Sequence, residues 1–270
     1  MTADSPLQFD YLRRIWALRH FWISLVTNDI RSRYRRSLLG VGWSLLRPLG
    51  MTTIFCVVFG TLFNQDITTY APYVLISMTT WQFLMESLMS GCHCFASGSA
   101  YIRQQQIPHA IFPLRTILAG GFHFLVAFTL GIVVTAYFQG IPSIAHLALL
   151  PFAIMMLLAL SWSLAIIAGV AQTYFPDTSH LLEIGMQILF YLTPIMYRSN
   201  SPAFSTRGRL SLVFAWNPIQ SILELFRQPL LNGEWPSAFS IGMSLAFTGI
   251  AAAIACCLLR RLERTLVFWL

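Results

Sequence analysis

The residues best suited to chemistry are four arginines within six positions, Arg31, Arg33, Arg35 and Arg36. A guanidinium group presents a rigid fork of N–H donors that matches the oxygens of a phosphate group. These arginines stand directly before a long apolar stretch. The pattern therefore predicts a site for a phosphate-bearing lipid headgroup at a membrane surface. General attraction to anionic lipid and the setting of membrane orientation would need the same residues, and the sequence leaves both interpretations open.

Arg47 and Glu86 interrupt stretches that are otherwise apolar. An ionisable side chain inside a membrane span needs a partner, because a lone charge there is costly. At helical rise, Arg47 lies about 14 Å and Glu86 about 16 Å from the same expected membrane surface. These matching depths predict an ion pair between the two residues. In the alternative, Arg47 extends toward the headgroups and Glu86 is protonated.

Catalytic and metal-binding patterns are weak in this sequence. The chain contains no lysine, which excludes a phosphate-binding P-loop because that motif requires one. Cys92, His93 and Cys94 have the composition of a metal site, but helical residues two positions apart point about 200° away from each other. We therefore expect no metal site here and no enzymatic activity on this chain.

The composition indicates an all-α membrane protein. Apolar residues make up 56% of the chain and charged residues 10%, whereas a soluble protein carries about 25% charged residues. A stretch of about 20 apolar residues is long enough to cross a bilayer as a helix. We expect six transmembrane helices, at 42–63, 72–97, two within 116–176 that are separated at 140–142, 178–197 and 235–259.

The arginines predict the orientation of these spans. Twelve of the 17 lie on the side of the two termini, four lie in the third loop of the other side, and one lies within a span. Because cytoplasmic loops retain positive charge, we expect both termini in the cytoplasm. The same asymmetry explains the net charge of +7 without a nucleic-acid partner.

The chain divides into a cytoplasmic segment, residues 1–36, and a transmembrane domain, residues 37–270. Apolar residues recur at helical spacing in the first segment, which predicts an amphipathic helix in the membrane interface. A soluble helix packed on a partner is the alternative. The apolar residues are Leu12, Ile15, Trp16, Trp22, Ile23, Val26 and Ile30.

The outer segment 198–236 is too long for a simple turn. Asn217-Pro218 is suited to the start of a helix, and an apolar stripe follows it. We therefore predict a re-entrant or interfacial helical hairpin between the fifth and sixth helices. The stripe consists of Ile219, Ile222, Leu223, Phe226 and Leu230. Elsewhere, Gly120, Gly121, Gly131 and Gly169 suit close approach between helices.

One stretch resembles the signature of a known family. It reads Arg33-Tyr34-x-x-Ser37-x-Leu39-Gly40-x-x-Trp43-x-x-x-x-Pro48-Leu49. This is similar to the motif of the membrane subunit of polysaccharide ABC exporters, which carry O-antigen, capsule or teichoic-acid chains. The resemblance continues over the interface helix, the six spans and the hairpin. It implies a permease that moves a lipid-linked or nascent polysaccharide outward across the inner, or plasma, membrane.

The resemblance also implies partners and residue roles. Two copies of the chain would enclose a channel, and two separate ATP-binding subunits, which carry ATP and Mg²⁺, would dock beneath it. The loop 98–115 would couple the subunits, although residues 104–106 are glutamines where the family often has basic residues. The residues with implied roles are Arg33, Tyr34, Arg35, Arg36, Leu39, Gly40 and Trp43 for the substrate pyrophosphate, Tyr101, Ile102, Arg103, Ile107 and Phe112 for coupling, and Tyr197, Asn217 and Pro218 for an outer gate.

Three other functions share some of these features. A drug or lipid exporter of the wider ABC group would share the spans without needing the arginine motif. A membrane-embedded glycosyltransferase or acyltransferase would need clustered polar residues on one side, whereas Asp66, Glu224 and Glu234 are scattered. A passive channel would need polar rings along its spans and no ATPase partner.

Overall fold

The computed structural model describes residues 8–62, 65–104, 107–140, 143–197 and 216–269, and within these ranges the chain is helical and forms no strand. The helices are α1 (Gln8–Ala17), α2 (Arg19–Arg33), α3 (Trp43–Phe55), α4 (Ile67–Cys92), α5 (Cys94–Gln104), α6 (Ile111–Gln139), α7 (Ile144–Leu147), α8 (Leu150–Tyr174), α9 (Thr178–Leu192), α11 (Pro218–Arg227) and α12 (Ala238–Trp269). A 3-10 turn, Gly40–Gly42, leads into α3, and π-helical turns extend α3 over Cys56–Gly60 and α11 over Gln228–Asn232. The expected all-α class is confirmed.

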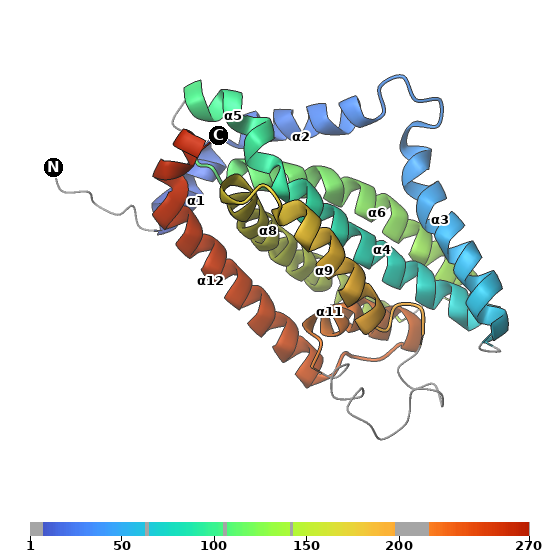
Figure 1. Cartoon of the computed structure of the whole chain (residues 1–270). Helices are drawn as coiled ribbons and strands as arrows, with labels where there is room; N and C mark the ends of the chain where they lie inside the picture. Colours follow the sequence, from blue (N-terminus) through green and yellow to red (C-terminus); the bar gives the residue numbers. More distant parts are fainter. Residues whose placement is uncertain (1–7, 63–64, 105–106, 141–142, 198–215, 270) are drawn as a thin grey trace.

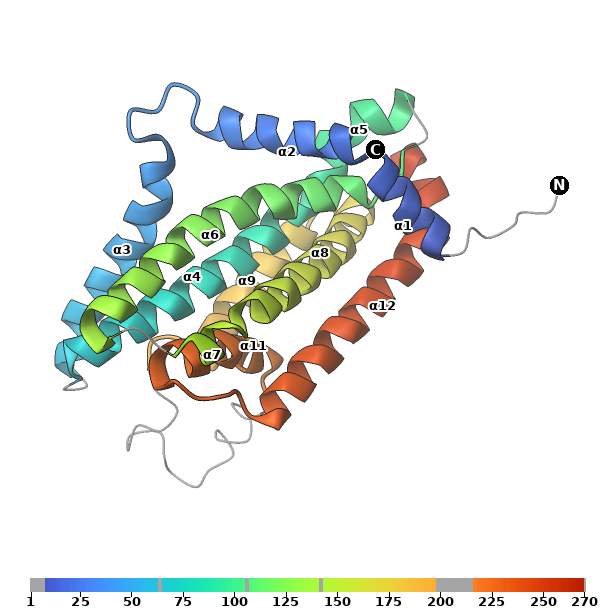
Figure 2. The same cartoon turned by 180° about the vertical axis from the view of Figure 1, so that it is seen from behind.

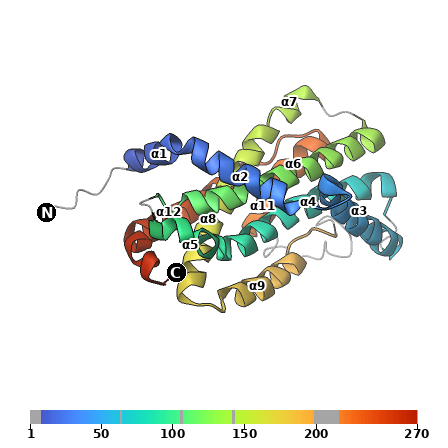
Figure 3. The ribbon, with the colours of Figure 1, turned by 90° about the horizontal axis from the view of Figure 1, so that it is seen from above.

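The helices form a bundle with two distinct ends (Figures 1 and 2). Helices α3, α4, α6, α8, α9 and α12 alternate in direction between these ends. Helices α1, α2 and α5 lie at one end, together with the carboxyl-terminal part of α12, while α7 and α11 lie at the other. Seen along the bundle, α2 lies across its end, over α6, on which it packs (Figure 3).

Four helical stretches have the length and apolar composition of membrane spans: Gly40–Gly60, Ile111–Gln139, Ile144–Tyr174 and Ala238–Arg261. Of the expected spans, those formed by α4 and α9 do not meet these criteria. Helix α9 has only 15 residues, fewer than the roughly 17 that a span needs. Helix α4 is long enough at 26 residues but contains many serines and threonines. Its position in the bundle explains this composition.

Helix α4 is the most enclosed of the long helices of the bundle. It packs on α3, α6, α8, α9 and α11, and every residue from Val74 to Trp81 is buried. Within this buried stretch, the hydroxyls of Thr79 and Thr80 donate to the backbone carbonyls of Leu75 and Ile76. A helix that faces protein on most sides does not need the apolar surface of a lipid-facing helix. Polar side chains can therefore occur along α4.

Helices α4 and α8 cross at glycines. A Cβ atom on Gly91 would lie 2.6 Å from the Cα of Ala165, and one on Gly169 would lie 2.8 Å from the carbonyl oxygen of Gly91. Such distances leave no room for a side chain, so the two backbones are in direct contact. The predicted role of Gly169 in close approach is confirmed. Sequence reasoning missed its partner, Gly91, in the last turn of α4.

The amino-terminal region differs from the expected single amphipathic helix. The chain bends at Leu18 between α1 and α2, and the indole nitrogen of Trp22 donates across the bend to the Ile15 carbonyl at 3.1 Å. Ile15 is buried with α5, α6 and α8 in a second apolar cluster. Trp16, by contrast, is 66% exposed, so the predicted apolar stripe is divided between the protein and its surroundings.

We expect Gly91→Ala and Gly169→Ala each to lower the free energy of unfolding by about 1–3 kcal/mol, because a methyl group would push two packed backbones apart. Gly249→Ala in α12 is the matched control, since its Cβ would meet nothing within 4 Å. Thermal unfolding of the purified chain in detergent measures the difference. Equal stability of the three variants would contradict the described crossing.

Candidate functional site

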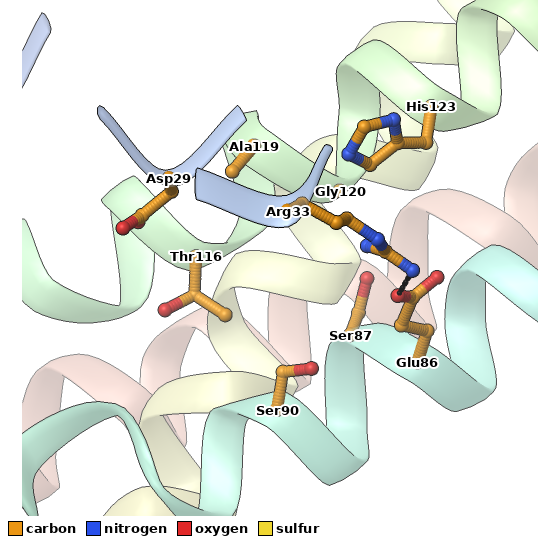
Figure 4. Close-up of a pocket in the computed structure, with 9 residues that line it drawn as sticks. All are labelled: Asp29, Arg33, Glu86, Ser87, Ser90, Thr116, Ala119, Gly120 and His123. Atoms are coloured by element: carbon orange, nitrogen blue, oxygen red, sulfur yellow. Dashed lines mark ion pairs between the residues drawn. The ribbon is translucent and has the colours of Figure 1, made fainter. Parts of the chain in front are cut away.

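A polar pocket lies where α2 crosses α4 and α6 (Figure 4). Its volume is about 170 Å³. Helix α2 contributes two charged residues, α4 one carboxylate and two serines, and α6 a threonine, a histidine and two small residues. The lining residues are Asp29, Arg33, Glu86, Ser87, Ser90, Thr116, Ala119, Gly120 and His123. The pocket therefore joins the predicted arginine cluster to the charge of α4.

An ion pair between Arg33 and Glu86 closes one side of the pocket. The Arg33 Nη2 atom lies 2.6 Å from Glu86 Oε1, and both side chains are partly exposed. The predicted pair between Arg47 and Glu86 is wrong, because Arg47 is exposed on α3 and forms no ion pair with any described residue. Helix α2 folds over the bundle and places Arg33 at the level of Glu86, a position that the depths of the spans alone do not define.

A second ion pair fastens α2 to α6. The Arg115 guanidinium donates from Nε and Nη2 to the two carboxylate oxygens of Asp29, each at 2.5 Å. The Arg115 and Asp29 side chains are 18% and 29% exposed, so this pair is less exposed than the Arg33–Glu86 pair. Asp29 precedes Arg33 by one helical turn, with Leu25 a further turn back. This spacing is the signal by which sequence reasoning could have found the face that α2 turns toward the bundle.

The turn between α2 and α3 is held by a cluster of hydroxyls around His123. The Tyr34 hydroxyl lies 2.6 Å from Ser44 Oγ and 2.7 Å from His123 Nδ1, and the Tyr34 and His123 rings meet edge to face. The turn itself uses left-handed backbone at Arg36, with φ of 68°, and at Gly40, with φ of 50°. Glycine accepts this conformation without strain, whereas arginine does so at a cost.

The other residues of the predicted phosphate site lie outside the pocket. Arg35 and Arg36 are exposed on the turn, together with Leu39 and Trp43. Arg31 is exposed on the preceding turn of α2. The cluster is therefore divided, because Arg33 is paired in the pocket while its neighbours face outward. Leu39 and Trp43 provide apolar surface beside these cations.

The predicted coupling segment is divided in the same way. Ile102, Ile107 and Phe112 are buried in the chain's own second apolar cluster, and a Cβ on Gly98 would collide with the Phe112 ring at 2.3 Å. The expectation that Ile102 and Ile107 present a docking surface is therefore wrong, since they hold α5 against the bundle. Tyr101 and Arg103 are exposed. Residues 105–106 lie outside the described residues.

The opposite end of the bundle contains a buried arginine that sequence reasoning assigned to an outer loop. Arg227, at the end of α11, is 6% exposed. Its Nε donates to Ser77 Oγ and its Nη2 to the Pro194 carbonyl, each at 2.7 Å. Its guanidinium carbon lies 4.3 Å from the centre of the Tyr73 ring. The arginine thus joins α11 to α4 and to the extended chain that follows α9.

The extended chain after α9 is buried over residues 193–196. The Tyr73 hydroxyl lies 2.9 Å from the carbonyl oxygen of Pro194 and 3.0 Å from that of Tyr197. The Tyr70 hydroxyl donates to the Met196 carbonyl. Irregular backbone at this depth needs such partners, because unpaired carbonyls are costly away from water. Tyr197, a predicted gate residue, is part of this network.

Asn217 and Pro218 begin α11 as predicted. The Asn217 side chain accepts from the Ile219 amide at 3.0 Å and donates to Thr193 Oγ1 at 2.9 Å, so it caps α11 and ties it to the chain after α9. Pro218 follows at the first helical position. The predicted apolar stripe of α11 is buried in the main core. Residues 198–215 of the predicted outer gate segment lie outside the described residues.

In the described part of the chain, no group of three histidine, cysteine, aspartate or glutamate side chains is arranged to hold a metal ion. Cys92 ends α4, and Cys94 begins α5 with its side chain buried. The intervening His93 is exposed.

Comparisons with known proteins place these features in a wider group. The ABC-2 type transporter family matches residues 20–231 of this chain. The O-antigen export system permease protein RfbA of Klebsiella pneumoniae is 26% identical over 233 residues, which cover 84% of this chain and 88% of that protein. RfbA of Myxococcus xanthus is 21% identical over 239 residues, covering 88% and 90%. The polysialic acid transport protein KpsM of Escherichia coli is 22% identical over 254 residues, covering 90% and 94%.

We expect Asp29→Asn to lower the free energy of unfolding by about 1–3 kcal/mol, because it breaks a two-pronged, partly buried ion pair. Glu86→Gln breaks a more exposed pair and should cost less than about 1 kcal/mol. Thermal unfolding in detergent compares the two variants. A double-mutant cycle with Arg115→Gln should give a coupling energy for Asp29 and Arg115, and additive losses would contradict the contact.

We expect Arg227→Met to cost about 2–4 kcal/mol of stability, because buried oxygen acceptors lose their donor. Arg13→Met is the matched control, since Arg13 is exposed on α1. Chemical unfolding followed by circular dichroism measures both variants. If Arg227→Met were as stable as the control, the guanidinium would not hold this end of the bundle together.

Proposed function

The chain belongs to the ABC-2 type transporter family, and we propose that it is the permease subunit of an ATP-driven exporter that moves a polysaccharide, or its lipid-linked form, out of the cytoplasm. The observation that carries this proposal is the extent of the similarity to polysaccharide permeases. The proteins named for O-antigen export and for polysialic acid transport align with 84% to 90% of this chain. The family match, residues 20–231, includes both the charged pocket and the buried outer network.

We propose six membrane passes, formed by α3, α4, α6, α8, α9 and α12. Their alternating direction supports this count, as does the position of α1 and the end of α12 at the same end of the bundle (Figure 1). This end faces the cytoplasm in the proposed orientation, because it contains most of the arginines. Helices α1 and α2 then form the cytoplasmic interface segment in the inner membrane, and α11 forms part of a re-entrant hairpin.

The substrate's pyrophosphate, in this proposal, binds at the turn between α2 and α3. Arg35 and Arg36 are exposed there, and charged hydrogen bonds from arginine to phosphate are strong and directional. Arg33 is paired with Glu86 and therefore supports the turn. The anion binds first to Arg35 and Arg36, whose guanidinium groups are exposed. Tyr34, through His123, fixes where the turn begins. Leu39 and Trp43 lie beside the lipid chain.

The energy for transport comes from partner chains in this proposal. Two ATP-binding subunits bind ATP and Mg²⁺, and two copies of the permease enclose the path of the polymer. Tyr101 and Arg103 are exposed at the cytoplasmic end, which makes them the coupling contacts. Ile102, Ile107 and Phe112 keep α5 firmly on the bundle, so that movement of α5 is passed on to α6 and α8.

The outer gate is assigned to the network around Arg227. Tyr197 is hydrogen-bonded to α4 and Pro194 to α11, while Asn217 donates to Thr193. Displacement of α11 would break these bonds together. The gate therefore has a defined closed arrangement, in which one guanidinium connects three separate segments.

The test is transport of a polyprenyl-diphosphate-linked oligosaccharide by the permease co-purified with its ATP-binding subunit in proteoliposomes. We expect ATP-dependent transport, and loss of it when the ATPase active site is inactivated. Arg35→Gln with Arg36→Gln should weaken the apparent affinity for the oligosaccharide about 10- to 100-fold, because two charged hydrogen bonds are lost.

Arg13→Gln with Arg14→Gln is the matched control, since it removes two adjacent exposed arginines from α1. A permease that purifies without an ATP-binding subunit would contradict the proposed function. Equal affinities of the two double variants would contradict the proposed phosphate site and leave the transporter class standing.

A further inference from the structure

The pocket beneath α2 contains a polar group that the fold itself does not use. Ser87 lines the pocket and is 4% exposed, and its buried hydroxyl has no hydrogen-bond partner among the described residues. Figure 4 shows it beside the Arg33–Glu86 pair. A buried hydroxyl without a partner costs stability. Its presence in a pocket points to a ligand that supplies the missing bond.

The charges of the pocket argue against an anionic ligand. Arg33 is neutralised by Glu86, and Arg115 is neutralised by Asp29. A phosphate that entered would have to displace a carboxylate from its guanidinium and remain beside it. The displaced carboxylate and the phosphate would repel each other at close range, so the exchange would be unfavourable for either ion pair. The pocket is therefore suited to an uncharged ligand.

The remaining lining is suited to a ligand rich in hydroxyl groups. Asp29 and Glu86 have carboxylate oxygens that accept additional hydrogen bonds, and the hydroxyls of Ser87 and Ser90 both donate and accept. The Thr116 hydroxyl donates to the Phe112 carbonyl and can still accept a hydrogen bond. Ala119 and Gly120 leave space on the wall formed by α6 (Figure 4). The volume of about 170 Å³ is several times the roughly 30 Å³ that one water molecule occupies in the liquid.

We propose that this pocket binds one neutral sugar ring. This inference rests on the proposed function, and it places the sugar unit nearest the lipid phosphate in the pocket while Arg35 and Arg36, two and three residues beyond Arg33, hold the phosphate. Recognition is then divided between two adjacent places. The pocket contacts the hydroxyls of the first sugar ring, and the exposed turn binds the phosphate.

The test uses two substitutions that change the pocket and leave both ion pairs in place. Ala119→Leu fills the space on the α6 wall. Ser87→Ala removes the unpartnered hydroxyl and should not lower the thermal stability, because no internal hydrogen bond is lost. Ala136→Leu is the matched control, since Ala136 is a partly buried alanine near the other end of the same helix.

The probes are neutral methyl glycosides of common hexoses and N-acetylhexosamines, with inorganic pyrophosphate as the anionic probe. Saturation-transfer NMR on the full-length protein in detergent measures binding. We expect at least one glycoside to bind, Ser87→Ala to weaken it about fivefold, Ala119→Leu to abolish it, and Ala136→Leu to leave it unchanged. Pyrophosphate binding should depend on Arg35 and Arg36 and remain unaffected by Ala119→Leu.

Two results would overturn the inference. One is the absence of glycoside binding to the unsubstituted protein, and the other is pyrophosphate binding that is lost with Ala119→Leu and Ser87→Ala. A lipid-linked oligosaccharide distinguishes a joined ligand from a free sugar, because its affinity should fall with the pocket variants and with Arg35→Gln/Arg36→Gln. Failure of the permease to purify with an ATP-binding subunit would remove the proposed function even if glycosides bind.

Discussion

The enclosure of α4 by other helices is the constraint on which the rest of the structure depends. Because α4 faces protein along most of its length, it can carry Ser77 and Ser87 buried and Glu86 paired with Arg33. These residues supply one partner at each end of the bundle, Glu86 for Arg33 and Ser77 for Arg227. The close contact at Gly91 and Gly169 keeps α4 deep enough for both. A helix that met lipid on one face could not do this, since each exposed polar group would be costly there.

The sequence predicted the class of the fold and several local features for sound physical reasons. Asn217-Pro218 carries its own capping chemistry, and the stripe of α11 has a period that only a helix buries. The prediction failed where a residue's role depends on a helix in another part of the chain. Glu86 meets Arg33 because α2 folds over the bundle, a path that apolar stretches alone do not define. Arg227 was counted with the outer loop because a buried arginine and an exposed one look the same in a sequence.

The arginines of this chain fall into two groups with different physical roles. Arg33, Arg115 and Arg227 make side-chain contacts that hold helices together. Arg35, Arg36 and Arg103 are exposed and leave their donors for other molecules. A count of positive charge combines these groups, although one stabilises the fold and the other is open to partners. The structure separates them by whether the guanidinium is paired within the chain, which is why the predicted phosphate site is smaller than the motif that suggested it.

The turn between α2 and α3 has a mechanical consequence. Helix α2 is fastened to α6 and α4 by two ion pairs. Helix α3, in contrast, buries only Pro48 and Thr52, and its first turn is tied to the bundle through Ser44, Tyr34 and the imidazole of His123. A short link with left-handed backbone at Arg36 and Gly40 therefore joins a firmly fastened α2 to a sparsely buried α3. His123 contacts both helices, α2 through Tyr34 and α3 through Ser44.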